Sequence, residues 1–226
     1  MTRLAAFIFI SISFVQHSFV HAAEVIAEDD VTIRQSNGNQ GQGSLLLKHD
    51  SSSGSSSNRA AWFKFDLTGL DADSDASAEF EITFQTSGAS GLFELEAFGL
   101  NSGFAGTTDW SEGTLAWASP PPGASSNLHS VSSDMTSLGT TNFTLSADSE
   151  VSFTITNLGD FIQTDNTLTL ALFSNTYDGS PLAFYSKESA GAGQSPTLTY
   201  AVIPEPGSLM LMFSGLIGLY LLKRRS

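Results

Sequence analysis

The sequence contains no cysteine, and histidine and basic residues are scarce in it. Of 226 residues, nine are Lys or Arg and four are His. The absence of cysteine excludes disulfides, thiol catalysis and Cys-ligated zinc sites. After the first 23 residues only His49 and His129 remain, so a His-rich metal site is excluded as well.

The long middle part of the chain is strongly acidic. Between Glu24 and Ile203, 22 acidic residues stand against five basic ones, which gives a net charge of −17 with His neutral. Nucleic acid is not an expected partner, because binding it needs clustered cations that neutralise phosphates. This balance favours an acidic, soluble surface protein. About 180 residues are enough for one domain with a hydrophobic core, and no repeat of solenoid or propeller period is evident.

The N-terminus has the features of a secretory signal. Arg3 supplies a positive charge, and an apolar run follows from Leu4 to Val15. Small residues suit cleavage after Ala22 or Ala23. Residues 1–23 are therefore predicted to be a signal peptide, followed by an ectodomain over residues 24–201.

The C-terminal segment, residues 202–226, combines an extended stretch, an apolar run and a basic cluster. Pro204 and Pro206 oppose helix, and a hydrophobic helix is expected from Leu209 to Leu222. Its fourteen residues would reach about 21 Å, short of a hydrocarbon core of about 30 Å. The basic residues that follow favour the cytoplasmic side of a membrane. From these properties alone, a short membrane anchor is one open interpretation.

The same tail resembles the PEP-CTERM sorting signal, in which Pro-Glu-Pro, a hydrophobic helix and an Arg-rich end follow in that order. The matching residues are Pro204, Glu205, Pro206, Lys223, Arg224 and Arg225. The resemblance implies an exosortase as a partner during export, transient contact with the inner membrane, and a secreted or cell-surface protein in a bacterium that makes exopolysaccharide.

Hydrophobic residues in the ectodomain alternate with a period of two. The stretch "SAEFEITFQ" places Phe80, Ile82 and Phe84 on one face and Glu79 and Glu81 on the other. Such alternation, separated by Gly, Ser, Asp and Asn turns, is typical of half-buried antiparallel strands. We expect one antiparallel β-sandwich of jelly-roll type, with these residues buried: Phe63, Phe65, Phe80, Ile82, Phe84, Phe153, Ile155, Leu168 and Leu170.

Five further stretches follow one another along the ectodomain, and they read "DDVTIRQS", "GSLLLKHD", "NRAAWFKFDLTGL", "DWSEGTLAWASPPP" and "FYSKESAGAGQSPTLTY". In this order they resemble the DNRLRE family of disaggregatase-related, carbohydrate-binding modules. The match covers about residues 28 to 200, and one departure is "TLAW", where two residues separate Thr114 from Trp117. The resemblance implies a β-sandwich that binds polysaccharide.

All five cations of the ectodomain lie in these stretches, namely Arg34, Lys48, Arg59, Lys64 and Lys187. One interpretation is a local basic patch that binds an acidic or hydroxyl-rich glycan. The other is that the cations are structural partners of Asp66, Glu112 or Glu188. Lys64 has outward parity in its strand, so it is expected to reach solvent on a sheet surface.

Three tryptophans are candidates for stacking on sugar rings. Trp62 has outward parity and is the preferred platform, whereas Trp110 and Trp117 are expected to pack at the rim of the sandwich. The run "DADSD" imitates the start of an EF-hand loop, but Ala76 and Ile82 stand where Gly and Glu are needed. A solvated turn is expected there, with no metal and no cofactor.

No enzymatic function is indicated. A G-x-S-x-G elbow is absent, and the many carboxylates do not single out a glycosidase pair. Two functions remain open: a carbohydrate-binding module that binds exopolysaccharide or another acidic glycan, and a passive structural component of the surface or matrix.

Overall fold

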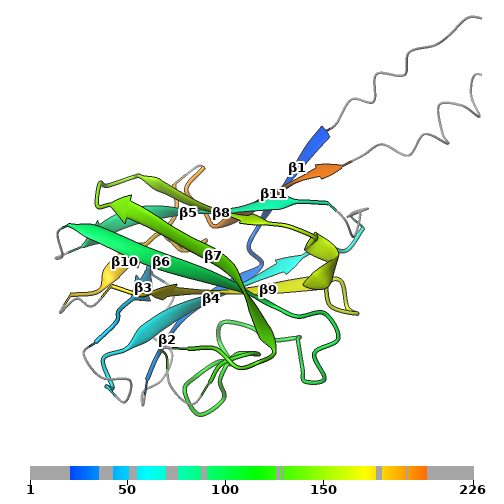
Figure 1. Ribbon diagram of the computed structural model, residues 1–226, viewed down its shortest axis with the longest axis horizontal. Coiled ribbons are helices and arrows are strands. Elements are labelled where there is room, and N and C mark those ends of the chain that lie inside the picture. The colour runs from blue at the N-terminus through cyan, green and yellow to red at the C-terminus, as the bar shows by residue number, and fades with distance from the viewer. Residues whose placement is uncertain are drawn as a thin grey trace, which may run out of the picture. The chain divides into compact units, whose positions relative to one another are not determined.

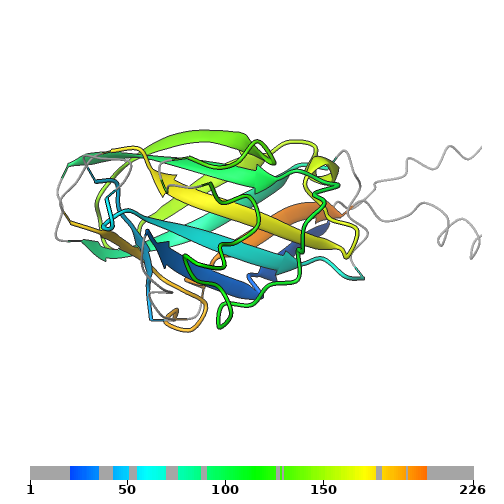
Figure 2. The ribbon, with the colours of Figure 1, turned by 90° about the horizontal axis from the view of Figure 1, so that it is seen from below.

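The computed structural model describes residues 21–35, 43–50, 55–69, 76–87, 91–125, 128, 130–176, 180–191 and 193–202. Within Ala22–Val202, which form one compact unit, two antiparallel sheets pack face to face (Figures 1 and 2). The predicted β-sandwich is confirmed. The helical content of the described part is the single 3-10 turn Leu158–Asp160.

The first sheet is built around the ten-residue strand β5, Ala78–Ser87. On one side β5 pairs with β8, and on the other with β10 and β11, which are flanked by β3 and β1. The bounds are β1 His21–Ile26, β3 Leu45–Leu47, β8 Glu150–Ile155, β10 Leu182–Phe184 and β11 Thr197–Val202.

The second sheet has the order β2-β4-β9-β6-β7. It begins at the edge strand β2 and ends at the long edge strand β7. The bounds are β2 Asp29–Arg34, β4 Arg59–Asp66, β6 Leu92–Leu100, β7 Met135–Thr144 and β9 Thr167–Ser174.

The path of the chain between the sheets is that of a jelly roll. Strands β3 to β6 alternate between the sheets, and β7 to β10 complete the two four-stranded sheets β3-β10-β5-β8 and β4-β9-β6-β7. This is the double Greek-key arrangement of that fold. β1, β2 and β11 extend it.

Strands β10 and β11 behave as two halves of one interrupted strand. Phe184 is paired with Phe84, Thr197 with Glu81 and Tyr200 with Ala78, so both halves run antiparallel along the same strand β5. Residues 185–196 separate the two halves in the sequence. β3 accompanies the β10 half and β1 the β11 half, at opposite ends of β5 (Figure 1).

Inward-facing apolar residues form the main core between the sheets. All nine residues predicted to be buried are less than 5% exposed, because alternate side chains of each strand point to the same face. Aromatic rings meet in edge-to-face pairs, such as Phe63 and Phe80, whose centroids lie 4.9 Å apart.

A second hydrophobic cluster covers the outer face of the second sheet. The long connection between β6 and β7, residues 101–134, runs along that face and contributes Trp110, Leu115 and Leu128 to it. They pack with Val31, Ile33, Ala60, Trp62, Leu100, Met135, Ala171 and Phe173. The strands β2, β4 and β9 are therefore covered on both faces, although antiparallel sheets commonly leave one face to solvent.

The terminal predictions fall largely outside the described residues. No described helix is long and apolar enough to cross a membrane, and the expected helix Leu209–Leu222 belongs to the part that the structure does not describe. β1 begins at His21, inside the segment 1–23, so the boundary of the signal peptide stays a prediction.

Candidate functional site

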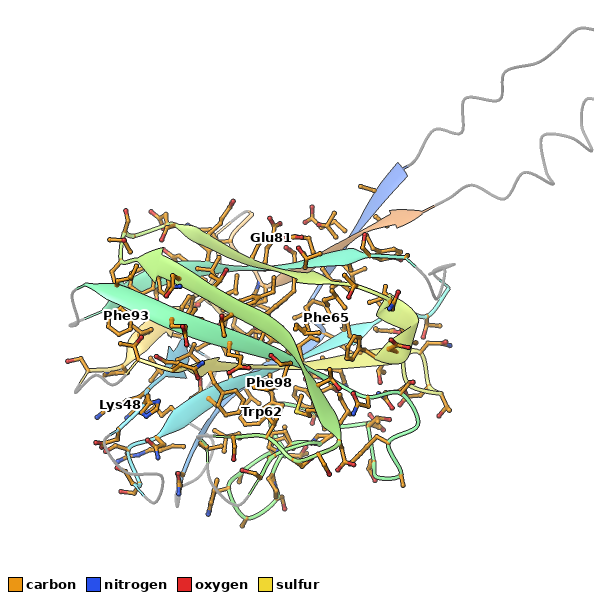
Figure 3. The ribbon with its side chains drawn as sticks, in the orientation of Figure 1. Lys48, Trp62, Phe65, Glu81, Phe93 and Phe98 are labelled. Carbon is orange, nitrogen blue, oxygen red and sulfur yellow. The ribbon has the colours of Figure 1, made fainter. Side chains whose placement is uncertain are left out.

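Three of the five predicted cations lie in adjacent backbone positions at one end of the sandwich. Arg34, the last residue of β2, is paired with Arg59, the first residue of β4. On the other side of Arg59, Lys48 forms an isolated antiparallel bridge with two backbone hydrogen bonds, of 3.0 and 2.9 Å. Directly opposed residues place their side chains on the same face. We call Arg34, Arg59 and Lys48 the basic row (Lys48 is labelled in Figure 3).

The basic row has no carboxylate partner within the described residues. The ion pairs found there all involve Lys64 or Lys187. Arg34 donates from Nε to the carbonyl oxygen of Ser56, at 2.7 Å. Burial lowers the pKa of Arg59, and the neighbouring charge of Arg34 lowers it further. The Nε atom of Arg59 is buried without a hydrogen-bond partner in the described part of the chain.

A buried polar network holds the segments that carry the basic row. Asn58, which is fully buried, donates from Nδ2 to Gln35 Oε1 at 3.0 Å and accepts from the Asp50 amide at 2.8 Å. Gln35 Oε1 also accepts from the amide of Leu128, in the 101–134 connection. Because buried amide groups must be paired, this network fixes the ends of β2, β3 and β4 together. Sequence reasoning did not single out Asn58 or Gln35.

The other two cations, Lys64 and Lys187, lie together in a cluster of carboxylates. Lys64 Nζ is 2.8 Å from Asp29 and 3.2 Å from Glu28. Lys187 Nζ is 3.4 Å from both Glu112 and Glu188 and 3.8 Å from Asp29. Asp29 is thus shared by both ammonium groups. Lys64 is five positions from Arg59 along β4, which is about 17 Å.

The prediction that Lys64 reaches solvent is wrong. Its outward parity is correct, but the residue is only 4% exposed, because the 101–134 connection covers this part of the sheet. Its ammonium donates to the carbonyl oxygen of Trp110, at 2.5 Å, and lies 5.7 Å from the centroid of the Trp110 ring. Burial alone would lower the pKa of Lys64, but the hydrogen bonds to Asp29 and Glu28 and the negative charges of these two residues together raise that pKa.

Trp62 cannot serve as a stacking platform in this structure. Its parity is outward, as expected, yet it is fully buried in the second hydrophobic cluster and meets Phe173 edge to face, at 5.6 Å. Periodicity predicts the face of a strand that a residue occupies, but not whether a distant loop covers that face. Trp110 belongs to the second hydrophobic cluster and Trp117 packs against it. Both residues have a packing role, as expected, but they pack over the outer face of the sheet and not at the rim of the sandwich.

The 101–134 connection also forms an open cleft of about 570 Å³. Phe104, Trp110 and the three successive prolines line it, together with Asp109 and Asp134. Its aromatic and proline surfaces could contact a sugar ring, but the acidic residues would repel a polyanion. The cleft is therefore less suited to an acidic glycan than the basic row.

Sequence reasoning missed a group of three carboxylates beside Lys187. Three carboxylate oxygens lie within 4.8 Å of one another, one from each of Asp30, Glu112 and Glu188. Burial raises the pKa of Asp30 to about 7, and the Glu188 and Glu112 charges add to this effect, whereas the hydrogen bond from the Lys187 amide opposes it. All three residues lie in the stretches that carried the family resemblance, and that shared location was the available signal.

Several predicted residues lie outside the described part of the chain. The sorting residues Pro204, Glu205, Pro206, Lys223, Arg224 and Arg225 belong there, as do Asp71, Asp73 and Asp75 of the expected solvated turn. Their predicted roles stay predictions.

Comparison with known families gives two matches that together span nearly the whole chain. Residues 21–201 match the model of carbohydrate-binding module family 96, and residues 202–225 match the PEP-CTERM protein-sorting motif. No curated protein matches the chain. The first match covers the entire sandwich, including the basic row and the carboxylate cluster. The chain therefore belongs to carbohydrate-binding module family 96 and carries a PEP-CTERM sorting motif at its C-terminus.

Proposed function

We propose that this protein, exported and sorted through its C-terminal motif, binds an acidic extracellular polysaccharide through the basic row. Family membership supports glycan binding by the sandwich, and the sorting motif supports export to the cell surface. An exopolysaccharide made by the same bacterium is the ligand that fits both the glycan-binding family and the export to the cell surface. The enzyme that handles the tail would be an exosortase at the inner membrane.

The observation that carries this proposal is the contrast between the two groups of cations. Like charges that face one another across strands are destabilising. The chain neutralises Lys64 and Lys187 with its own carboxylates, and it has 22 acidic residues in the ectodomain with which to do so. Within the described residues it leaves Arg34, Arg59 and Lys48 without such partners. An external anion can supply the missing charge.

The geometry of the basic row suits carboxylates spaced along a chain. Neighbouring strands lie about 4.8 Å apart, so three adjacent positions span about 10 Å. Guanidinium groups bind carboxylates with two parallel hydrogen bonds, and such charged bonds are stronger than neutral ones. Although the ectodomain charge of −17 opposes a polyanion, screening over about 8 Å at physiological salt leaves local attraction effective.

Binding of a polyuronate to the purified protein, measured by isothermal titration calorimetry, tests the proposal. Arg34→Ala and Lys48→Ala should each weaken binding by about 10- to 150-fold, the scale of a lost charged hydrogen bond. Lys187→Gln is the matched control, because it removes the same charge from the carboxylate cluster instead of the basic row. A neutral glucan should bind far more weakly than the polyuronate.

Three results would contradict the proposal. If the folded Arg34→Ala and Lys48→Ala variants bind every glycan as the parent does, the basic row is not the site. If the parent binds the neutral glucan as well as the polyuronate, the open cleft beside Trp110 becomes the better candidate. Failure of the parent to bind any glycan would favour a passive matrix protein.

A further inference from the structure

We propose that Asp30, Glu112 and Glu188 form a calcium site that joins three distant segments of the sandwich. Asp30 belongs to the edge strand β2, Glu112 to the 101–134 connection, and Glu188 to the segment between β10 and β11. One carboxylate oxygen of each lies within 4.8 Å of the others, so a single ion placed among them can contact all three. This inference does not depend on the proposed glycan binding.

The strongest observation in favour of a ligand is the Asp30 side chain. The residue is only 1% exposed, and its Oδ2 accepts a 2.7 Å hydrogen bond from the Lys187 amide. Its Oδ1 is buried and has no hydrogen-bond partner among the described residues. A buried carboxylate oxygen is costly to leave unpaired. A cation beside Oδ1 would compensate that cost.

The charges around Asp30 do not balance. Five carboxylates and two ammonium groups meet here, and they belong to Glu28, Asp29, Asp30, Glu112, Glu188, Lys64 and Lys187. The excess of negative charge is three if every group is ionised. Asp30 and Glu112 are largely withdrawn from water, and burial is the main cause that raises the pKa of each. A divalent cation would offset most of this excess.

The donor set selects calcium among the common metals. It consists of carboxylate oxygens. The carbonyl oxygen of Glu28 is also nearby, because it accepts a hydrogen bond from Lys187 Nζ, the ammonium that contacts these carboxylates. Oxygen donors without nitrogen or sulfur suit hard cations. Ca²⁺ accepts six to eight ligands in irregular geometry, whereas Mg²⁺ needs a near-ideal octahedron. Three carboxylates from loops and a strand edge, completed by water, fit the more tolerant ion.

The Lys187 ammonium competes with such an ion for the same carboxylates. Its ammonium lies 3.4 Å from both Glu112 and Glu188, so it already compensates part of their charge. The side chain is 23% exposed and can turn toward solvent when calcium enters. Competition from this lysine predicts weak affinity, in the range of about 10⁻⁴ to 10⁻³ M that extracellular calcium modules show. It also predicts that removing the lysine strengthens calcium binding.

Terbium luminescence on the purified protein tests the site, with Trp110 beside the cluster as the antenna. Tb³⁺ should bind at one site and be displaced by Ca²⁺ but not by equal Mg²⁺. Glu188→Gln should weaken the binding about 10- to 100-fold, and Lys187→Gln should tighten it.

The control is Glu79→Gln, which changes the net charge by the same amount as Glu188→Gln but lies on the outer face of β5. Calcium should raise the melting temperature of the parent and not of Glu188→Gln.

The opposite results are equally definite. No sensitised emission and no shift of the melting temperature with millimolar Ca²⁺ would overturn the proposal. So would equal weakening by Glu79→Gln and Glu188→Gln, because that indicates adsorption to an acidic surface. If Asp30→Asn leaves terbium binding unchanged, Asp30 is not a ligand, and a proton shared with a neighbouring carboxylate accounts for its unpartnered oxygen.

Discussion

At the scale of single residues, the ammonium of Lys64 is held by several partners at once. It is buried beneath the 101–134 connection and contacts Asp29, Glu28 and the carbonyl oxygen and ring of Trp110. Taking an ammonium out of water is costly, and the cost is offset only when several partners have good geometry. These contacts therefore fasten the connection to β4, and Lys64 has a structural role.

Replacing Lys64 by Met should destabilise the protein by about 3 kcal/mol, because Asp29 would lose its closest cation in a largely buried position. Urea unfolding at pH 7 measures this loss. The double variant Lys64→Met with Asp29→Asn should recover part of it, since it removes the unpaired charge. A single variant as stable as the parent would show that the Lys64–Asp29 pair contributes nothing.

At the scale of elements, the outer face of β5 carries like charges. Glu79 and Glu81 point outward from this strand, and Glu150 lies opposite Thr83 on the neighbouring β8. Burial and then the charges of Glu150, Glu79 and Glu24 raise the pKa of Glu81. A carboxyl group whose pKa is raised on folding opposes folding when it is ionised. The cost is present at neutral pH and disappears below the pKa of the unfolded chain.

Glu81→Gln should therefore stabilise the protein at pH 7 by about 0.2–1 kcal/mol, the scale of a repulsive cross-strand pair. Near pH 3 the advantage should vanish, because the parent carboxyl is then protonated in both states. Paired thermal melts at the two pH values measure the difference. An equal gain at both values would point to packing and not to charge.

The 101–134 connection depends on a close approach at Gly123. This residue has φ of +78°, and a Cβ atom there would lie 2.4 Å from Cγ and Sδ of Met135. Gly103, in the same connection, has φ of +79° but open space around its Cβ position. Comparing an alanine substitution at the two positions therefore distinguishes the cost of the left-handed backbone from the cost of steric overlap with Met135.

Gly103→Ala should cost about 1–2 kcal/mol from the left-handed backbone alone, and Gly123→Ala should cost more because Met135 must also shift. Chemical unfolding of both variants measures the two costs. Equal costs would mean that Met135 moves aside freely. Since Met135 belongs to the second hydrophobic cluster, we expect the near-UV circular dichroism of the tryptophans to change only in Gly123→Ala.

Sequence periodicity correctly predicted which residues of each strand face the core. It did not predict which outward-facing residues are covered by other parts of the chain. Phe63 and Phe65 are buried as expected, because the period of two directly reports which side chains share a face. The same period assigned Trp62 and Lys64 to solvent, although both are covered. That cover is the 101–134 connection, which begins 37 residues after Lys64, and nothing in the strand itself encodes it.

The candidate site was predictable only in part for a similar reason. The sequence singled out Arg34, Lys48 and Arg59, but their proximity depends on the bridge that Lys48 makes with β4. Long-range pairings of this kind come from the jelly-roll path and not from local pattern. The carboxylate group around Asp30 requires three segments that are distant in the sequence to meet, namely β2, the 101–134 connection and the segment between β10 and β11.

At the scale of the whole molecule, the sorting motif predicts that the mature protein is shorter than its gene product. We expect residues 207–226 to be absent from protein recovered from a host that has an exosortase, because the PEP-CTERM motif implies cleavage by this enzyme near residues 204–206. Intact mass spectrometry measures the length. Replacing Glu205 and both prolines by Ala should leave the tail in place, whereas recovery of the complete tail from the unaltered protein would contradict the prediction.

The interrupted strand formed by β10 and β11 has a mechanical consequence. Lys48 follows β3 at the Ser87 end of β5, whereas the chain leaves the sandwich from β11, beside Ala78. These ends are nine residues apart along β5, about 30 Å. If a glycan holds the basic row while the cell surface holds the chain beyond Val202, tension runs parallel to the strands. Hydrogen bonds between antiparallel strands lie perpendicular to the strands. Tension along the strands therefore loads many of these bonds at the same time instead of breaking them one after another. A module loaded in this direction would keep the glycan attached to the cell surface when fluid flow pulls on it.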